Sequence, residues 1–286
     1  MTPNIKYIDI HGHPNFVAYD NDRDEVVKRA LAADVAIIAV GTQTDTSKKA
    51  IELAHKYDNV YAAIGLHPIH TSASHHDLQE IGEDGKEFTS RGEVADPAVY
   101  LGMAKQPKVV AIGECGLDYY HMDEESVSKQ LQAFITMIEV ANEVGKPLML
   151  HLRSGSGKSA YVDAFQILKK HAKVKGNLHF FAGSVEEAKL FLDLGFTFSF
   201  TGVVTFARSY DEVLRFLPLE SIMSETDCPY VTPTPYRGSR NEPLYVVEVV
   251  KAIAEIRKEP LDMVSKQLLE NARDFFNLKS GGVSSL

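Results

Sequence analysis

Two histidines separated by a single glycine, His11 and His13, follow a short apolar run close to the start of the sequence. Residues two apart in a β-strand point to the same face, so both imidazoles would project in one direction. Two imidazoles held this close are natural ligands for one divalent metal ion. The pair alone is weak evidence, because an isolated His-x-His pair more often makes ordinary hydrogen bonds.

Four further side chains with metal-binding groups stand at the ends of other apolar runs: Glu114, His151, His179 and Asp227. If these runs are parallel strands of one barrel, their carboxyl ends meet at the rim where barrel enzymes hold their active sites. Buried ionisable groups are costly unless they are paired or bound to a metal. Packing alone explains these positions poorly, so the sequence predicts a metal centre.

The placement of these residues suggests a role for each of them in binding metal or in catalysis. The first histidine pair is expected to hold one divalent cation, and His151 with His179 a second. Glu114 would bridge the two, and Asp227 would complete the first site and deprotonate an attacking water; both are therefore predicted to be catalytic. Two-metal centres suit phosphoester hydrolysis, although a site with one ion stays open. Imidazole ligands favour zinc or manganese, whereas magnesium prefers oxygen ligands.

The elements that must position these groups follow a regular pattern. Short runs rich in valine and isoleucine alternate with amphipathic stretches, which is typical of parallel strands joined by helices. The predicted strands are residues 5–10, 35–40, 60–65, 108–113, 147–151, 177–181, 196–200 and 221–226. Eight such units predict an α/β fold, the (β/α)8 TIM-type barrel. A doubly wound open sheet would give the same alternation and stays an alternative.

The remaining segments complete this picture. Residues 241–258 are a suitable eighth helix, and 261–277 predict an extra C-terminal helix packed on the outside. The polar, acidic and glycine-containing stretch 70–106 is interpreted as an extended loop with a short helix or two after strand three. No linker or internal repeat interrupts the pattern, so we expect residues 1–286 to form a single metal-dependent hydrolase barrel domain.

Composition narrows the class of protein. The formal net charge is −9, which argues against charge-driven wrapping around duplex DNA. Bound divalent cations would still reverse the sign locally for an anionic substrate. No apolar stretch is long enough to cross a bilayer, no signal peptide is recognisable at the start, and two cysteines make no disulfide framework. These features predict a cytoplasmic protein with no membrane partner.

Seven motifs occur in a characteristic order: DIHGH, GLHP, VAIGECGLDYY, HLR, HFFAG, SETDCPY and RGSRNEP. In this order they resemble the TatD-type metal-dependent deoxyribonucleases of the amidohydrolase superfamily, over nearly the whole chain. The resemblance implies a (β/α)8 fold and hydrolysis of DNA phosphodiester bonds, typically as a 3′-to-5′ exonuclease on single-stranded ends. It also implies the six predicted residues as metal ligands, and it allows magnesium or manganese as the working ion. The departures, a longer 70–106 loop, Ile69 after the HP dipeptide and Ala182 for a common serine, touch no predicted ligand.

Three residues near the predicted site are candidates for binding substrate. His67, at the end of the third strand, could contact the scissile phosphate or merely hold the Pro68 turn. Arg153 and Arg240 have the guanidinium geometry that suits bidentate phosphate contacts, although a surface ion pair is nearly as plausible for either one. Tyr119 and Tyr120 could stack on a base, but tyrosines in such loops often only pack.

We therefore hypothesise a metal-dependent hydrolase acting on ester bonds of DNA, with single-stranded ends as substrate and no obligate protein partner. Two rival functions remain. The same centre would serve an amidohydrolase-type activity on a small ester, lactone or amide. A non-catalytic, metal-stabilised binding protein is the alternative from another class, although all six ligand positions are intact.

Overall fold

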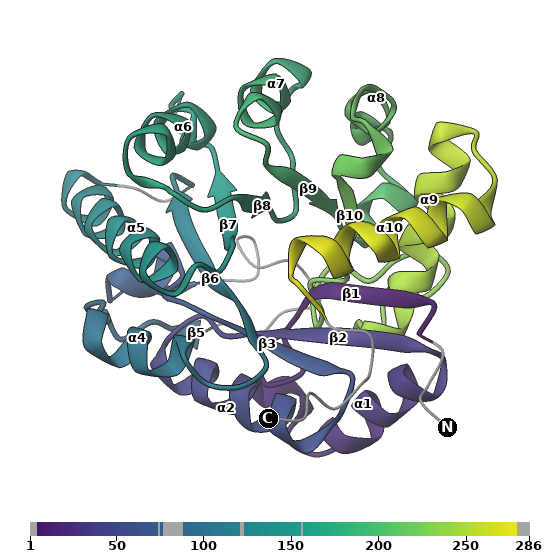
Figure 1. Cartoon of the computed structure of the whole chain (residues 1–286), viewed down its shortest axis with the longest axis horizontal. Helices are drawn as coiled ribbons and strands as arrows, with labels where there is room; N and C mark the ends of the chain where they lie inside the picture. Colours follow the sequence, from purple (N-terminus) through teal and green to yellow (C-terminus); the bar gives the residue numbers. More distant parts are fainter. Residues whose placement is uncertain (1–4, 74, 77–87, 121–122, 156, 279–286) are drawn as a thin grey trace.

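Eight strands form one parallel sheet that curls into a nearly closed barrel (Figure 1). The structure is a computed structural model that describes residues 5–73, 75–76, 88–120, 123–155 and 157–278. The strands, in sheet order, are β1 (Tyr7–Gly12), β2 (Val35–Val40), β3 (Val60–Ile64), β6 (Val109–Asp118), β7 (Leu148–Arg153), β8 (Gly176–Leu178), β9 (Thr197–Phe200) and β10 (Ile222–Ser224). All eight predicted strands are present, and the (β/α)8 barrel is confirmed.

Helices follow the strands and surround the sheet (Figure 1). They are α1 (Arg23–Ala32), α2 (Thr44–Lys56), α4 (Pro97–Ala104), α5 (Glu124–Val144), α6 (Ala160–His171), α7 (Val185–Asp193), α8 (Asp211–Phe216), α9 (Val246–Arg257) and α10 (Leu261–Phe275). Short 3-10 helices lie at η1 (Val17–Tyr19), η2 (Pro68–Thr71), η3 (Gly202–Thr205), η4 (Arg208–Tyr210), η5 (Leu219–Ser221) and η6 (Pro243–Tyr245). No described helix is long and apolar enough to cross a membrane.

Local sequence sets the helix ends. Asp123 caps α5 by accepting a hydrogen bond from the backbone N–H of Ser126 at 2.7 Å, which satisfies a donor that the first turn cannot pair. The helix ends at Gly145, whose φ of 66° is the left-handed conformation that glycine adopts most easily. These caps fix how far each crossover helix extends, and so where the next strand begins.

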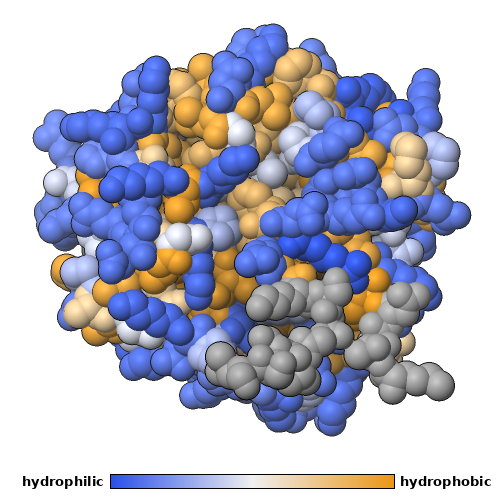
Figure 2. Space-filling model, in the orientation of Figure 1, coloured by the Kyte–Doolittle hydropathy of each residue, from blue (hydrophilic) through white to orange (hydrophobic). Residues whose placement is uncertain are grey.

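Apolar side chains pack in two layers. Strand side chains that point away from the barrel axis join helix residues in a large outer cluster between sheet and helices. Strand side chains on the opposite face of the sheet form a second cluster. This cluster contains no residue of α1 to α9, so it lies inside the barrel. Among its members are Ile8, Ile10, Ile38, Met149 and Met223. Each such side chain contributes about 1.5–3 kcal/mol by leaving water. On the face shown in Figure 2, hydrophilic side chains project outward and hydrophobic ones show mainly in the recesses between them.

The extra C-terminal helix covers the amino-terminal end of the barrel. Its Leu269, Ala272 and Phe276, the last just past its end, join the inner cluster. Asn271 donates to the backbone carbonyls of Leu219 and Ile222, at the start of β10, at 2.7 Å each. The predicted outside helix therefore seals the end of the barrel opposite the predicted ligands.

The extended segment after β3 contains the predicted short helix, α4. It also contains η2 and a small antiparallel pair of β4 (His75–His76) with β5 (Phe88–Thr89). Residues 74 and 77–87 of this predicted loop lie outside the described part of the chain.

Candidate metal centre

A β-bulge in β1 turns His11 toward the barrel interior. Asp9 pairs with Ile37 of β2 and Gly12 with Ala39, so three steps on β1 face two on β2. Ile37 and Ala39 face the helices, in the outer cluster. Their partners Asp9 and Gly12 therefore lie on that same face of the sheet. The extra residue therefore places His11 on the inner side, and bulges beside active sites commonly re-aim a side chain in this way.

A second bulge places Glu114. Ile112 pairs with Leu148 of β7 and Cys115 with Leu150, so β6 also carries one extra residue. Gly113 has a φ of 153°, and a Cβ there would lie 2.2 Å from the Met149 carbonyl oxygen, which only glycine avoids. The predicted strand ended before Glu114, whereas β6 continues to Asp118. Glu114 is thus held inside a strand rather than on a loop.

The Glu114 carboxylate lies at the centre of a group of five imidazoles. Its oxygens lie 2.9 Å from His151 Nδ1, 3.2 Å from His67 Nε2, 3.4 Å from His11 Nε2, 3.5 Å from His179 Nε2 and 3.8 Å from His13 Nε2. All the predicted ligands are brought together, and His67 joins them. A carboxylate among imidazoles is a donor set suited to divalent metal ions.

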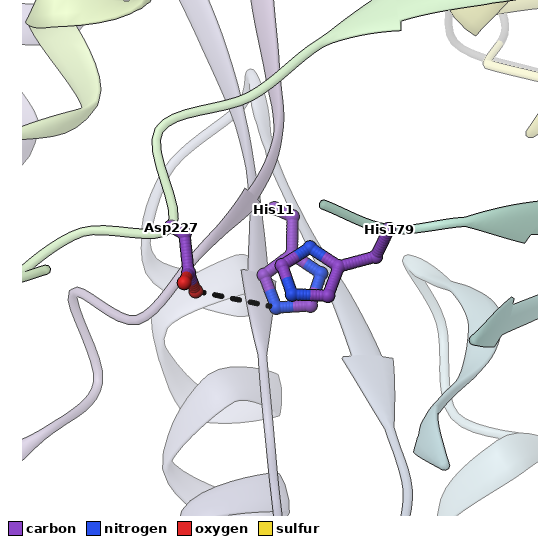
Figure 3. Close-up of side chains that lie close together, drawn as sticks. All are labelled: His11, His179 and Asp227. Atoms are coloured by element: carbon purple, nitrogen blue, oxygen red, sulfur yellow. Dashed lines mark ion pairs between the residues drawn. The ribbon is translucent and has the colours of Figure 1, made fainter. Parts of the chain in front are cut away.

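Asp227 lies beside this group, from the loop after β10. Its Oδ1 is 3.3 Å from His13 Nε2 and 3.8 Å from His11 Nε2, the second contact being the dashed line in Figure 3. The rings of His11 and His179 stack with centroids 3.5 Å apart (Figure 3). Three groupings of these side chains have donor atoms close enough to share an ion: His11–His179–Asp227, His11–His13–Glu114 and His67–Glu114–His151. The grouping differs from the predicted pairing of His151 with His179.

The burial of His11 fits a metal ligand. The side chain is fully buried, and neither ring nitrogen has a hydrogen-bond partner among the described residues. Buried polar atoms are normally paired, because an unpaired one loses its hydration without compensation. Burial lowers the pKa of His11 to about 3, so its ring is neutral and keeps a lone pair for a cation.

Two carboxylates that sequence reasoning missed hold two of these histidines. Asp118 Oδ2 lies 2.8 Å from His151 Nε2. Glu225, fully buried, lies 2.9 Å from His179 Nδ1 and accepts hydrogen bonds from Ser199 Oγ and the Phe180 N–H at 2.7 Å each. A signal was available, because Glu225 lies within the predicted strand 221–226, two residues after Met223, whose side chain is in the inner cluster. Metal-binding histidines usually donate their second N–H to such a carboxylate.

Electrostatics within the group follow from these contacts. Burial acts to lower the pKa of His151 and His179. The hydrogen bond that His151 donates to Asp118 raises its pKa to about 9, and the charge of Glu225 raises that of His179 to about 10. Burial acts to raise the pKa of Glu114, and the surrounding imidazoles hold it well below its ordinary value. Glu114 is therefore an anion at neutral pH, ready to face a cation.

The candidate substrate-binding residues occupy different settings. His67 lies inside the imidazole group, and its Nδ1 accepts a hydrogen bond from the Ile69 N–H at 3.2 Å, so it also holds the Pro68 turn. Arg153 ends β7 with its guanidinium carbon 3.8 Å from the centre of the Tyr120 ring. Arg240 pairs with Asp22 and donates to the Ala18 carbonyl oxygen at 2.7 Å, so this guanidinium already ties two loops together.

Comparison with known proteins places these features in a family. The family model for TatD-related DNases matches residues 8–277. A metal-dependent hydrolase of Bacillus subtilis, YabD, is 37% identical over 275 residues, covering 94% of this chain and 98% of the relative. The 3′-5′ ssDNA/RNA exonuclease TatD of Klebsiella pneumoniae is 33% identical over 276 residues, covering 93% of this chain and 95% of the relative.

Solved structures agree with the sequence relatives. The crystal structure of YjjV, a TatD homologue from Escherichia coli, superposes with a TM-score of 0.79 at 28% identity, covering 98% of this chain and all of that one. The match extends over the whole barrel, including the strands that carry the histidine–carboxylate group. This chain belongs to the TatD-related DNase family and is a metal-dependent hydrolase.

Proposed function

We propose that this enzyme hydrolyses phosphodiester bonds in DNA as a 3′-to-5′ exonuclease on single-stranded ends. The observation that carries the proposal is the single Glu114 carboxylate with five imidazole nitrogens within 3.8 Å. Ligands on both sides of one carboxylate suit a pair of cations that clamps a phosphoryl group. The name of the Klebsiella relative supports the nucleic-acid substrate and the polarity.

We assign the cation ligands to the six residues predicted from sequence: His11, His13, Glu114, His151, His179 and Asp227. When bound, two divalent cations (zinc, manganese or magnesium) would polarise the phosphoryl oxygens and ease deprotonation of the attacking water. Glu114 would hold the two ions at a fixed separation. His67 would contact the scissile phosphate from the same group.

Asp227 is our candidate for the general base. Its side chain is 13% exposed, against 5% for Glu114, so water can reach it more easily. Its position beside His11 and His13 lets the carboxylate accept the proton of an attacking water and hold it at an oxygen. Arg153 is assigned to a neighbouring phosphate, where a guanidinium can donate to two oxygens at once. Arg240, whose Nη1 and Nη2 already donate to Asp22, is assigned to a neighbouring phosphate through its charge.

Replacing Asp227 with Asn tests the proposal. We expect turnover of a 3′-labelled single-stranded oligonucleotide to fall by about 10²-fold or more, because the amide cannot accept the proton. Circular dichroism should match the wild type. Each enzyme is stripped with a chelator and reloaded with zinc, manganese or magnesium in turn. Undiminished activity of the metal-loaded variant would refute the role of Asp227.

The same preparations address the alternative substrate class. Wild-type enzyme is assayed on single- and double-stranded oligonucleotides and on a panel of small esters, lactones and amides. The proposal expects metal-dependent cleavage of the single strand from its 3′ end. Turnover of a small ester with no cleavage of any oligonucleotide would instead establish the other amidohydrolase-type activity.

A further inference from the structure

Two arginines lie over partly exposed aromatic rings. The guanidinium carbon of Arg153 is 3.8 Å from the centre of the Tyr120 ring, and that of Arg237 is 4.4 Å from the centre of the Phe206 ring. Tyr120 is 39% exposed and Phe206 44% exposed, so part of each ring faces solvent. Each pair offers a positive charge beside a π-surface.

Both pairs stand at the carboxyl ends of strands, on either side of β8 in the sheet order. Tyr120 follows β6 and Arg153 ends β7, whereas Phe206 follows β9 and η3, and Arg237 lies after β10. His179 comes directly after β8, between the two pairs in the sheet order. The pairs therefore bracket the metal centre along the rim.

The first pair is tied to the centre by hydrogen bonds. The Tyr120 N–H donates to Asp118 Oδ1 at 2.9 Å, and the other oxygen of Asp118 holds His151. Arg153 comes two residues after His151 on the same strand, so it has the same inward parity. Ring and guanidinium are thus positioned by the same strand ends that position the ligands.

The second pair is held where two loops pack together. Arg237 Nη1 donates to the Thr232 carbonyl oxygen at 2.9 Å, and the Thr234 N–H donates to Thr205 Oγ1 at 2.9 Å. A Cβ on Gly202 would lie 2.4 Å from the Val231 carbonyl oxygen, so the loops after β9 and β10 are in close backbone contact. The second of these loops also carries Asp227, which relates the pair to the centre.

We propose that Tyr120–Arg153 and Phe206–Arg237 are two stacking positions for the bases of a single strand whose end lies in the metal centre. This inference rests on the proposed function and specifies how single strands are selected. Aromatic rings stack on any base with an accessible face, whereas bases in a duplex already stack on each other. The arginines would place positive charge beside the neighbouring phosphates of the DNA. Such local charge matters because the protein as a whole has a formal net charge of −9.

Binding is measured by fluorescence anisotropy in the presence of a chelator, so that no cleavage intervenes. The two probes are a labelled oligothymidylate and an abasic strand with the same number of phosphates. Wild-type protein should bind the oligothymidylate more tightly. Tyr120→Leu and Phe206→Leu, which keep apolar bulk but remove the ring, should each weaken that binding about fivefold or more and narrow the difference between the probes.

Phe216→Leu is the matched control. Phe216 on α8 is also an exposed aromatic, 39% accessible, with the Lys189 ammonium 5.3 Å from its ring centre, but it lies on a helix outside the barrel. Its substitution should leave both affinities as in the wild type. An equal loss in this control would overturn the inference, because the effect would not belong to the rim.

The remaining outcomes separate this inference from the proposed function. If wild-type enzyme degrades the oligonucleotide but both rim variants keep the full preference for bases, the stacking positions are wrong and the nuclease proposal stands. Equal wild-type affinity for the abasic strand would also overturn the stacking positions. If wild-type enzyme neither binds nor cleaves any oligonucleotide with any of the three metals, the proposed function itself fails.

Discussion

Two histidines of the metal centre are each held at one ring nitrogen by a carboxylate, which leaves the other nitrogen facing Glu114. His179 is held through Nδ1 by Glu225, and His151 through Nε2 by Asp118. Such contacts fix the tautomer and the ring orientation, and they raise the basicity of the metal-binding nitrogen. The two acids are positioning residues, because they act on the cation through the imidazoles.

Replacing Glu225 with Gln tests this role at the level of one residue. We expect the affinity for zinc or manganese to fall about 10- to 100-fold, as the neutral amide holds His179 less firmly. The measurement is isothermal titration of metal-free protein. Ser199→Ala removes one hydrogen bond to Glu225 but keeps the carboxylate, so this variant should lose less metal affinity than Glu225→Gln. Unchanged affinity in Glu225→Gln would contradict the role.

At the scale of the element, two strands with an extra residue determine which side chains face the centre. Without the bulge between Asp9 and Gly12, strict alternation would turn His11 toward the helices. The same holds for Glu114 and the bulge between Ile112 and Cys115. The period of a strand is two, so one inserted residue exchanges the two faces beyond it. The metal centre therefore depends on local irregularity in otherwise regular strands.

Gly113→Ala tests the second bulge. A methyl group would lie 2.2 Å from the Met149 carbonyl oxygen at a φ of 153°, so the strand must shift. We expect the free energy of unfolding to fall by about 1–3 kcal/mol and metal affinity to fall with it, measured by chemical denaturation and titration. The matched control is Gly102→Ala on α4, where a Cβ meets no atom within 4 Å; it should stabilise by up to about 1 kcal/mol. Wild-type stability and affinity in Gly113→Ala would refute the argument.

The whole molecule depends on the seam where the first strand meets the last. Asp9, buried in β1, accepts hydrogen bonds from the N–H of Thr226 at 2.9 Å and from its hydroxyl at 2.6 Å. The Asp227 N–H donates to the His11 carbonyl oxygen at 2.8 Å. These bonds bring His11 and Asp227, from opposite ends of the chain, to one cation site. Closure of the barrel therefore brings the residues of the site together.

Thr226→Val should weaken this seam. Valine has the shape of threonine but leaves a buried Asp9 oxygen without its hydroxyl donor, which costs about 1–3 kcal/mol of unfolding free energy. Denaturant titration of metal-free protein gives the value. Thr226→Ser, which restores the hydroxyl, should recover most of the loss. A serine variant as unstable as the valine variant would point to packing instead of the hydrogen bond.

The sequence by itself determined the eight strand–helix units and the residues that meet at one rim. Valine- and isoleucine-rich runs alternate with amphipathic stretches because a parallel sheet needs covered faces. His11, Glu114, His151 and His179 could be found because strong metal ligands at the ends of apolar runs have few packing explanations. The same logic predicted the C-terminal helix, though not the end of the barrel that it seals.

Tertiary structure alone decided what depends on register and on contacts between distant segments. A one-residue register shift has no signature in hydrophobic periodicity, so the predicted strand ended before Glu114 although β6 runs on to Asp118. The carboxylate that holds His179, Glu225, follows a strand far along the chain, so the contact between them depends on how the barrel closes. Sequence pattern specifies which side chains are buried, whereas three-dimensional packing specifies which of them touch.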